Sequence, residues 1–200
     1  MPGDYIYAMA TSPRRQGNSE TLLDRAIEGA RGLGVEVVKD ALGVDPVSPC
    51  MGCNHCGETG ECVQRDRMQE VYPHLAGAAA VILAAPVFSM HVCSQAKMLI
   101  DRCQRFWSVK YILKRHLVED EARRTGRAGL FISVCGRDAP ETFHCIKPTI
   151  AYFFQVLEIT GWESLELSGI DEQGAILQVP EALEQAYRLG AAMAERVLAL

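Results

Sequence analysis

Residues 78–85 constrain the fold class of this chain more than any other stretch of the sequence. They read Ala-Ala-Ala-Val-Ile-Leu-Ala-Ala and run directly into Pro86. A strand without polar positions has both faces covered, which is typical of a central strand in a parallel sheet. This stretch therefore predicts an α/β architecture in which helices cover both faces of the sheet.

Strands and amphipathic helices alternate along the rest of the chain. Further strands are predicted at residues 5–10, 35–38, 128–134 and 162–170. Helices are predicted from about residue 18 to Gly32–Gly34, and at 66–75, 95–109, 140–160 and 180–200. Residues 110–127 are more polar and predict an excursion over the surface. The alternation predicts one domain over residues 1–200, an α/β doubly wound five-stranded parallel sheet in the order 2-1-3-4-5.

Composition narrows the classes of function. The 200-residue chain carries a net charge of −5 and no basic run, so we expect no nucleic-acid partner. It has no apolar stretch of about eighteen residues, and Met1–Asp4 lacks the features of a signal peptide. We therefore expect no membrane association and a cytoplasmic location. In a reducing cytosol, eight cysteines indicate metal binding or catalysis rather than disulfides.

Four of the cysteines share one short loop at residues 49–62. Cys50, Cys53, Cys56 and Cys62 are separated by three, three and six positions, with glycines between them. Three thiolates this close suit one face of a cuboidal iron–sulfur cluster, and the fourth closes the cage. A structural zinc site usually divides its ligands into two pairs joined by a longer loop. The spacing favours an iron–sulfur cluster, and the alternatives are a zinc site or thiols that are redox-active or unligated. Outside this loop, we expect buried free thiols at Cys93, Cys103 and Cys145.

The polar loop from Thr11 to Ser19 is the second chemical feature. It joins a predicted buried strand to a helix N-terminus, where unpaired amides bind phosphate. Ser12, Asn18 and Ser19 can add side-chain donors, and Arg14 or Arg15 can add charge. Asn18 or Ser19 can also cap the helix. The loop is neither a Walker loop nor a Gly-x-Gly-x-x-Gly turn, so ATP and the usual dinucleotide fold are not supported. An ordinary polar connection with a capped helix has the same pattern, so both interpretations stay open.

Two more loops follow predicted strands. The first begins at Pro86 and runs through Val87, Phe88 and Ser89, and the second is Cys135–Arg137. Ligands of open α/β sheets bind at the carboxyl ends of the strands, where these loops and Thr11–Ser19 would meet. The amides of residues 87–89 could face a polar ring edge, with Phe88 packed beside the ring.

These motifs resemble a known family. Ser12-Pro13-Arg14-Arg15-Gln16-Gly17-Asn18-Ser19 is similar to the phosphate loop of the flavodoxin-like NADPH-dependent FMN reductase family. The Pro49–Cys62 pattern, followed by Asp66-x-Met68, resembles the iron–sulfur flavoprotein branch of that family. Ala85–Ser89 and Lys97-x-x-Ile100-Asp101-Arg102 are similar to its next landmarks. The resemblance extends over nearly the whole chain.

The resemblance implies two cofactors and their sites. It places the FMN phosphate at Ser12, Arg14, Gly17, Asn18 and Ser19, and the isoalloxazine at Pro86, Val87, Phe88 and Ser89, with Cys135 and Gly136 near the ring. It implies one 4Fe–4S cluster on Cys50, Cys53, Cys56 and Cys62, and a homodimer or homotetramer. Two residues depart from the family pattern: Phe88 replaces a tyrosine, and Arg67 replaces an acidic residue.

Together these expectations describe an FMN-dependent oxidoreductase. Electrons would enter from ferredoxin or a similar carrier and pass through the cluster and FMN to a small acceptor, with no catalytic acid, base or nucleophile from the protein. One alternative is an NAD(P)H-dependent quinone, nitro, azo or FMN reductase in which the cluster is auxiliary or absent. The other is a non-enzymatic, zinc-stabilised module that binds an anion.

Overall fold

A computed structural model describes residues 4–200 of the chain. Residues 1–3 lie outside this range. The expectation that the chain has no signal peptide was based on Met1–Asp4 and so falls mostly outside the described residues. Within residues 4–200, none of the helices combines the length and the apolar character needed to cross a bilayer.

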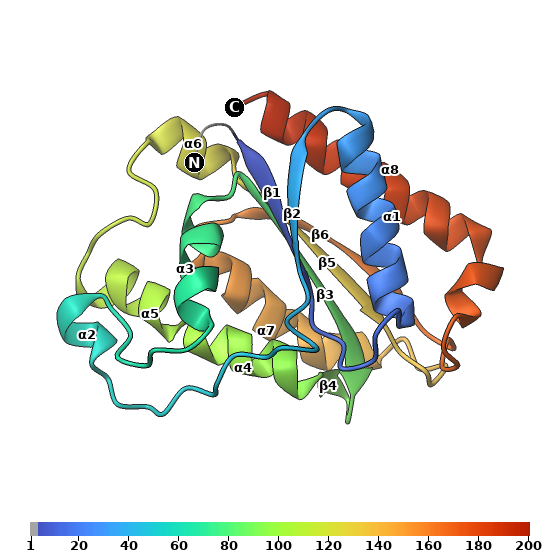
Figure 1. Cartoon of the computed structure of the whole chain (residues 1–200), viewed down its shortest axis with the longest axis horizontal. Coiled ribbons are helices and arrows are strands. Elements are labelled where there is room, and N and C mark those ends of the chain that lie inside the picture. Colours follow the sequence, from blue (N-terminus) through green and yellow to red (C-terminus); the bar gives the residue numbers. More distant parts are fainter. Residues whose placement is uncertain (1–3) are drawn as a thin grey trace.

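Five parallel strands form the centre of the molecule (Figure 1). They are β1 (Tyr5–Ala10), β2 (Glu36–Asp40), β3 (Ala80–Phe88), β5 (Ala128–Val134) and β6 (Gly161–Leu167), in the spatial order β2-β1-β3-β5-β6. Counted alone, these strands have the predicted order 2-1-3-4-5, and the flavodoxin-like architecture is confirmed. The predicted count of five was wrong, because the two-residue strand β4 (His91–Val92) returns antiparallel to the end of β3.

The alternation of side chains along the strands explains why helices cover both faces. Ile6, Ala8 and Ala10 of β1 face one core, while Tyr5, Tyr7 and Met9 face the other. The first core lies under α1 (Asn18–Gly32) and α8 (Pro180–Leu198). The second lies under α3 (Met68–Gly77), α4 (Ser94–Arg102), α5 (Gln104–Trp107) and α7 (Thr142–Val156). The central strands are buried on both sides, as residues 78–85 predict.

Other helical segments differ from their predictions. The helix predicted at 95–109 is divided at Cys103 and continues as the π-helical turn η1 (Ser108–Ile112). The predicted surface excursion contains α6 (Glu121–Gly126), which Asp120 caps by accepting the N–H of Arg123 at 2.7 Å. A short helix, α2 (Cys56–Thr59), lies inside the cysteine loop, and a 3-10 turn, η2 (Ala175–Gln178), precedes α8.

Candidate cofactor-binding site

Four loops meet at the carboxyl edge of the sheet, at the lower end of the strands in Figure 1. The backbone fixes them there: Thr11 donates its N–H to Ala84 at 3.0 Å, and Cys135 donates its N–H to Leu167 at 2.8 Å. The loops enclose a small cavity of about 70 Å³. It is lined by Ser12, Arg14, Gly17, Asn18, Ser19, Pro86, Val87, Phe88, Val134, Gly136, Ile170 and Asp171. All of the predicted cofactor residues except Ser89 and Cys135 thus line one cavity.

The first loop closes tightly before α1. The Oγ of Ser12 accepts the N–H of Arg14 at 3.1 Å, and a Cβ on Gly17 would lie only 3.1 Å from the carbonyl oxygen of Arg14. Gly17 occupies the cap position, so the expected cap at Asn18 or Ser19 was wrong; both residues lie in the first turn. Since the first N–H groups of a helix lack intrahelical partners, this turn presents donors at the cavity.

The side chain of Asn18 connects the first loop to the chain beyond β6. Its Nδ2 donates to the carbonyl of Glu172 at 2.8 Å, and its Oδ1 accepts the N–H of Gly174 at 3.0 Å. The residue is 8% exposed. The side chain is therefore engaged in holding the loop after β6, whereas no such bond involves the nearly buried Ser19 hydroxyl within the described chain.

The second loop carries two residues with left-handed backbone. Ser89 and Met90 have φ angles of 49° and 65° and form the tight turn between β3 and β4. Phe88 is 47% exposed beside this turn. Ser89 does not line the four-loop cavity but faces an adjoining surface hollow with His91 and Lys97. The part of the cavity that Phe88 lines is therefore open to solvent.

The third loop differs from its prediction in one residue. Cys135 is 5% exposed, and its backbone bonds to Leu167 and Ile170 hold the third and fourth loops together. Gly136 lines the cavity, and a Cβ there would lie 2.5 Å from Oδ1 of Asp171. A side chain at this position would force the exposed Asp171 side chain to move.

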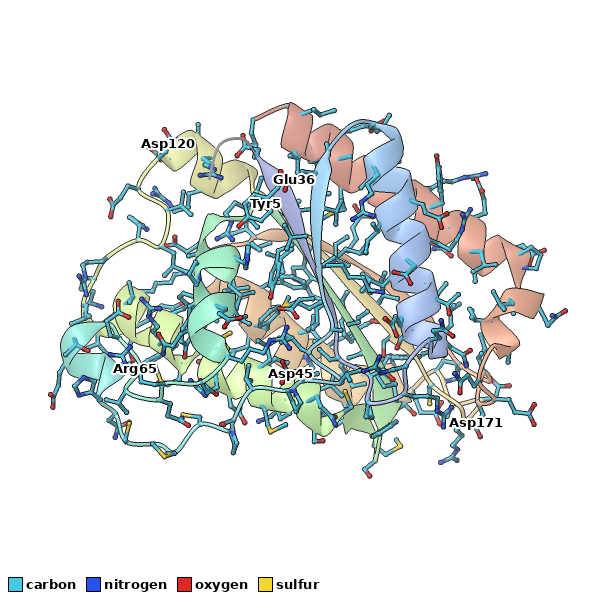
Figure 2. All side chains as sticks on the ribbon, in the orientation of Figure 1. Tyr5, Glu36, Asp45, Arg65, Asp120 and Asp171 are labelled. Carbon is cyan, nitrogen blue, oxygen red and sulfur yellow. The ribbon has the colours of Figure 1, made fainter. Side chains whose placement is uncertain are left out.

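The sequence analysis missed the fourth loop, which supplies Ile170 and Asp171. It extended the last strand to residue 170, but β6 ends at Leu167 and Gly169 adopts a φ of 76°. The pair Ser168-Gly169 is a turn signal that could have located the loop. Figure 2 shows Asp171 at the end of the molecule where this loop lies, and its backbone oxygen accepts a bond from Arg14 at 3.3 Å.

The four cysteines of the 49–62 loop line a second small cavity of about 30 Å³. Cys50 and Cys53 are exposed, and Cys56 and Cys62 are half-buried. Left-handed residues Gly52, Asn54 and Gly60 turn the loop around this cavity. Across residues 4–200, no three His, Cys, Asp or Glu side chains are placed closely enough to hold a metal ion. The thiols nevertheless surround one space, and their chemistry fits iron–sulfur or zinc.

The remaining cysteines lie elsewhere in the fold. Cys93, Cys103 and Cys135 are buried, and burial raises the pKa of Cys93 and Cys103. Both therefore stay protonated at neutral pH. Cys145 is exposed on α7, so the expectation that it is buried was wrong.

Strand order and the four-loop cavity define a flavodoxin-like α/β protein with a ligand site at the carboxyl edge of its sheet. The family model described as NADPH-dependent FMN reductase matches residues 5–144. The chain belongs to this family.

Curated relatives identify the branch. An iron–sulfur flavoprotein of Archaeoglobus fulgidus is 42% identical over 91 residues, which are 46% of this chain and 41% of that protein. The chain spans about half the length of the curated relatives it matches. The predicted iron–sulfur flavoprotein branch is confirmed by these relatives.

Solved structures share the fold. An NAD(P)H:quinone oxidoreductase from Methanothermobacter marburgensis superposes with a TM-score of 0.67 at 14% identity, covering 94% of this chain and 98% of that one. A flavodoxin from the domain Archaea superposes with a TM-score of 0.54 at 13% identity, covering 97% and 98%. At these identities the likeness establishes the fold alone.

Proposed function

We propose that this protein is a flavin-dependent oxidoreductase that binds FMN at the four-loop cavity and a 4Fe–4S cluster on the cysteine loop. The observation that carries the proposal is the convergence of the Thr11–Ser19, Pro86–Phe88 and Gly136 segments on one cavity at the N-terminus of α1. Membership of the FMN reductase family and the iron–sulfur flavoprotein relatives support the two cofactors.

Each loop has a distinct part in this proposal. Ser12, Ser19 and the first-turn amides of α1 would bind the phosphate, which Arg14 would help to neutralise. Phe88 would pack against the isoalloxazine at the open rim of the cavity. Asp171 lines the same cavity beside Arg14, whose guanidinium donates to its backbone carbonyl. The protein thereby binds and orients the flavin but donates no proton to it.

The cysteine loop would hold the second redox centre. Cys50, Cys53, Cys56 and Cys62 would be the ligands, since they surround one cavity. When bound, FMN exchanges one or two electrons and a 4Fe–4S cluster exchanges one, so together they link one-electron carriers to two-electron acceptors. We propose ferredoxin or a similar carrier as the donor, a small molecule as the acceptor, and a cytoplasmic homodimer or homotetramer as the working form.

A direct hydride pathway is the second candidate, because the family takes its name from NADPH. In that case NAD(P)H would reduce the flavin without ferredoxin, and the cluster would be auxiliary. The exposed rim at Phe88, beside the hollow that contains Lys97, leaves room for a nicotinamide cofactor to approach. Mixing the protein anaerobically with NADPH, and separately with reduced ferredoxin, distinguishes the two pathways by which reagent bleaches the flavin absorbance.

The proposal is tested by purifying the protein with and without oxygen and measuring its spectrum and metal content. We expect bound FMN and, anaerobically, about four iron and four labile sulfide per chain. A colourless protein with about one zinc per chain would overturn the proposal and support the zinc-stabilised anion-binding module.

A further inference from the structure

Arg102, at the end of α4, is the most deeply buried charged residue beside the cysteine loop. Its side chain is 1% exposed, and it lines the same small cavity as the four cysteines. Burying a guanidinium without partners is costly, so an arginine at this depth needs a specific set of acceptors.

The structure supplies those acceptors from both ends of the cysteine loop. The two terminal nitrogens bind the carboxylate of Asp66 at 2.8 and 2.9 Å, and Nη1 also donates to the carbonyl of Ser48 at 2.9 Å. Asp66 in turn accepts the backbone N–H of Ser48 at 2.8 Å. Arg102 and Asp66 therefore fasten the residue that precedes the loop to one that follows it.

Arg102 also contacts the ligand set itself. Its Nη2 lies 3.5 Å from Sγ of Cys62, a sulfur hydrogen bond. Its Nε is buried and has no hydrogen-bond partner within residues 4–200. Thiolates and bridging sulfides are acceptors, so this guanidinium has a donor left for them. Although burial opposes its charge, the bonds to Asp66 outweigh that effect and raise the pKa of Arg102.

We propose that Arg102 is the positioning residue of the cysteine loop and the fixed positive charge that raises the reduction potential of the bound cluster. The inference rests on the proposed function and names a regulating residue for that site. One electron taken from a one-electron donor adds one negative charge to a cluster. A buried cation bonded to a ligand sulfur stabilises the reduced form more than the oxidised form, because the charge it faces is larger.

The neighbouring carboxylate provides a test with opposite signs. Replacing Arg102 removes positive charge, while Asp66→Asn removes the negative charge that partly offsets it. Arg102→Lys keeps the charge but loses the planar, forked geometry. If the pair only held the loop in place, replacing Arg102 and replacing Asp66 would both loosen the loop and shift the reduction potential in the same direction.

The experiment is an anaerobic, EPR-monitored redox titration of the iron–sulfur holoprotein, with iron, sulfide and FMN counted per chain. Relative to the unchanged protein, we expect a more negative cluster potential in Arg102→Gln, a more positive one in Asp66→Asn, and an intermediate one in Arg102→Lys. Arg188→Gln removes an exposed arginine on α8, over the other core, and should leave the potential unchanged.

Shifts of the same sign in Arg102→Gln and Asp66→Asn, or an unshifted Arg102→Gln, would overturn the inference. If Arg102→Gln takes up no iron, Asp66→Asn decides alone, and an unchanged or more negative potential there rejects the assigned charge effect. Absence of iron and sulfide from the unchanged protein would instead reject the proposed function, so the two failures are distinguishable.

Discussion

Asn18 and Ser19 are adjacent in the cavity but have different partners. Asn18 bonds to Glu172 and Gly174, whereas the Ser19 hydroxyl remains for a ligand. Asn18→Ala should lower the free energy of unfolding by about 0.5–1.5 kcal/mol, because it breaks two part-buried hydrogen bonds to the backbone. Ser19→Ala should change stability by less than about 0.5 kcal/mol but weaken FMN by about 1.5–3 kcal/mol, the loss of one bond to a charged phosphate.

Urea unfolding without FMN and flavin titration of the folded proteins measure the two effects separately. Equal stability of all three proteins would contradict the bracing role of Asn18. Unchanged FMN affinity in Ser19→Ala would remove that hydroxyl from the proposed phosphate site.

Cys56 and Cys145 form a matched pair of cysteines. Cys56 lines the four-cysteine cavity, with its sulfur 3.3 Å from the Ser108 hydroxyl, while Cys145 is exposed on α7. Cys56→Ala should lose or convert the cluster, and Cys145→Ala should keep about four iron per chain. FMN content should stay the same in both, because the flavin loops are separate elements. Full iron in Cys56→Ala would disprove its assignment as a ligand.

At the level of elements, sequence patterns predict the continuously buried strands best. Residues 5–10 and 128–134 are predicted with correct bounds, since continuous burial leaves a strong pattern. The division of the helix at Cys103 leaves no such sign, because Leu99 and Phe106 stay buried on one face through the bend. The strand β4 is too short to show alternation, and the overextended last strand hid Asp171.

The same limit applies to the site. A loop that joins a strand to a helix and contains glycine, hydroxyl and arginine residues can be identified from consecutive residues of the sequence, and Ser12 and Gly17 were predicted in this way. The contact of Arg102 with Asp66 depends on tertiary packing between segments far apart in sequence. Local patterns do not encode such a contact.

Helices α1 and α8 approach closely through glycines. A Cβ on Gly190 would overlap the carbonyl of Ala26, whereas one on Gly32 would meet only the end of the Tyr187 side chain at 3.2 Å. Gly190→Ala should therefore cost about 1–3 kcal/mol by overpacking, while Gly32→Ala should stay within about 1 kcal/mol of the unchanged protein. Urea unfolding measures both. Equal stability of the two variants would disprove this close packing. FMN affinity should be unchanged in both variants.

Glu20 connects α1 to β2 through Lys39, with an Nζ–Oε1 distance of 2.8 Å. Burial opposes ionisation of Glu20, but the bonds from Lys39 and the Gln16 N–H outweigh it and lower its pKa. A lowered folded pKa stabilises the protein above the unfolded value of about 4.3, and that contribution is lost as the pH falls through the folded pKa.

Glu20→Gln should consequently cost about 0.5–1 kcal/mol at pH 7, and the difference should shrink below about pH 4. Unfolding free energies of both proteins across this range are the measurement. Glu184→Gln removes the exposed Glu184–Arg188 pair of α8 and serves as a control with a smaller expected loss. A cost for Glu20→Gln that is independent of pH would contradict the ionic explanation.

At the scale of the whole molecule, the two candidate sites lie in different regions of the folded protein. Figure 1 shows α2 and the cysteine loop on the left, whereas the β1–α1 connection lies below the sheet, toward the right. Apolar side chains are exposed in the cysteine loop and directly after it: Met51 is 65% exposed and Val63 is 41% exposed, and both line the cavity with the cysteines. A second copy placed over this loop would bury them, shield the cluster and bring it toward another flavin.

We therefore expect a dimer or larger assembly in sedimentation velocity at micromolar concentration. Met51→Glu should weaken association, because it places a charge on the apolar surface. Because Met51 also lines the cysteine cavity, iron and FMN are counted per chain, and only protein that retains both is compared. Leu177→Glu changes a residue of similar exposure, 58%, in η2 and should leave the assembly intact. In Met51→Glu, flavin reduction by reduced ferredoxin should slow on dilution, since the two cofactors of a pair would then separate. A strict monomer with both cofactors and a concentration-independent rate would contradict this assembly and place electron transfer within one chain.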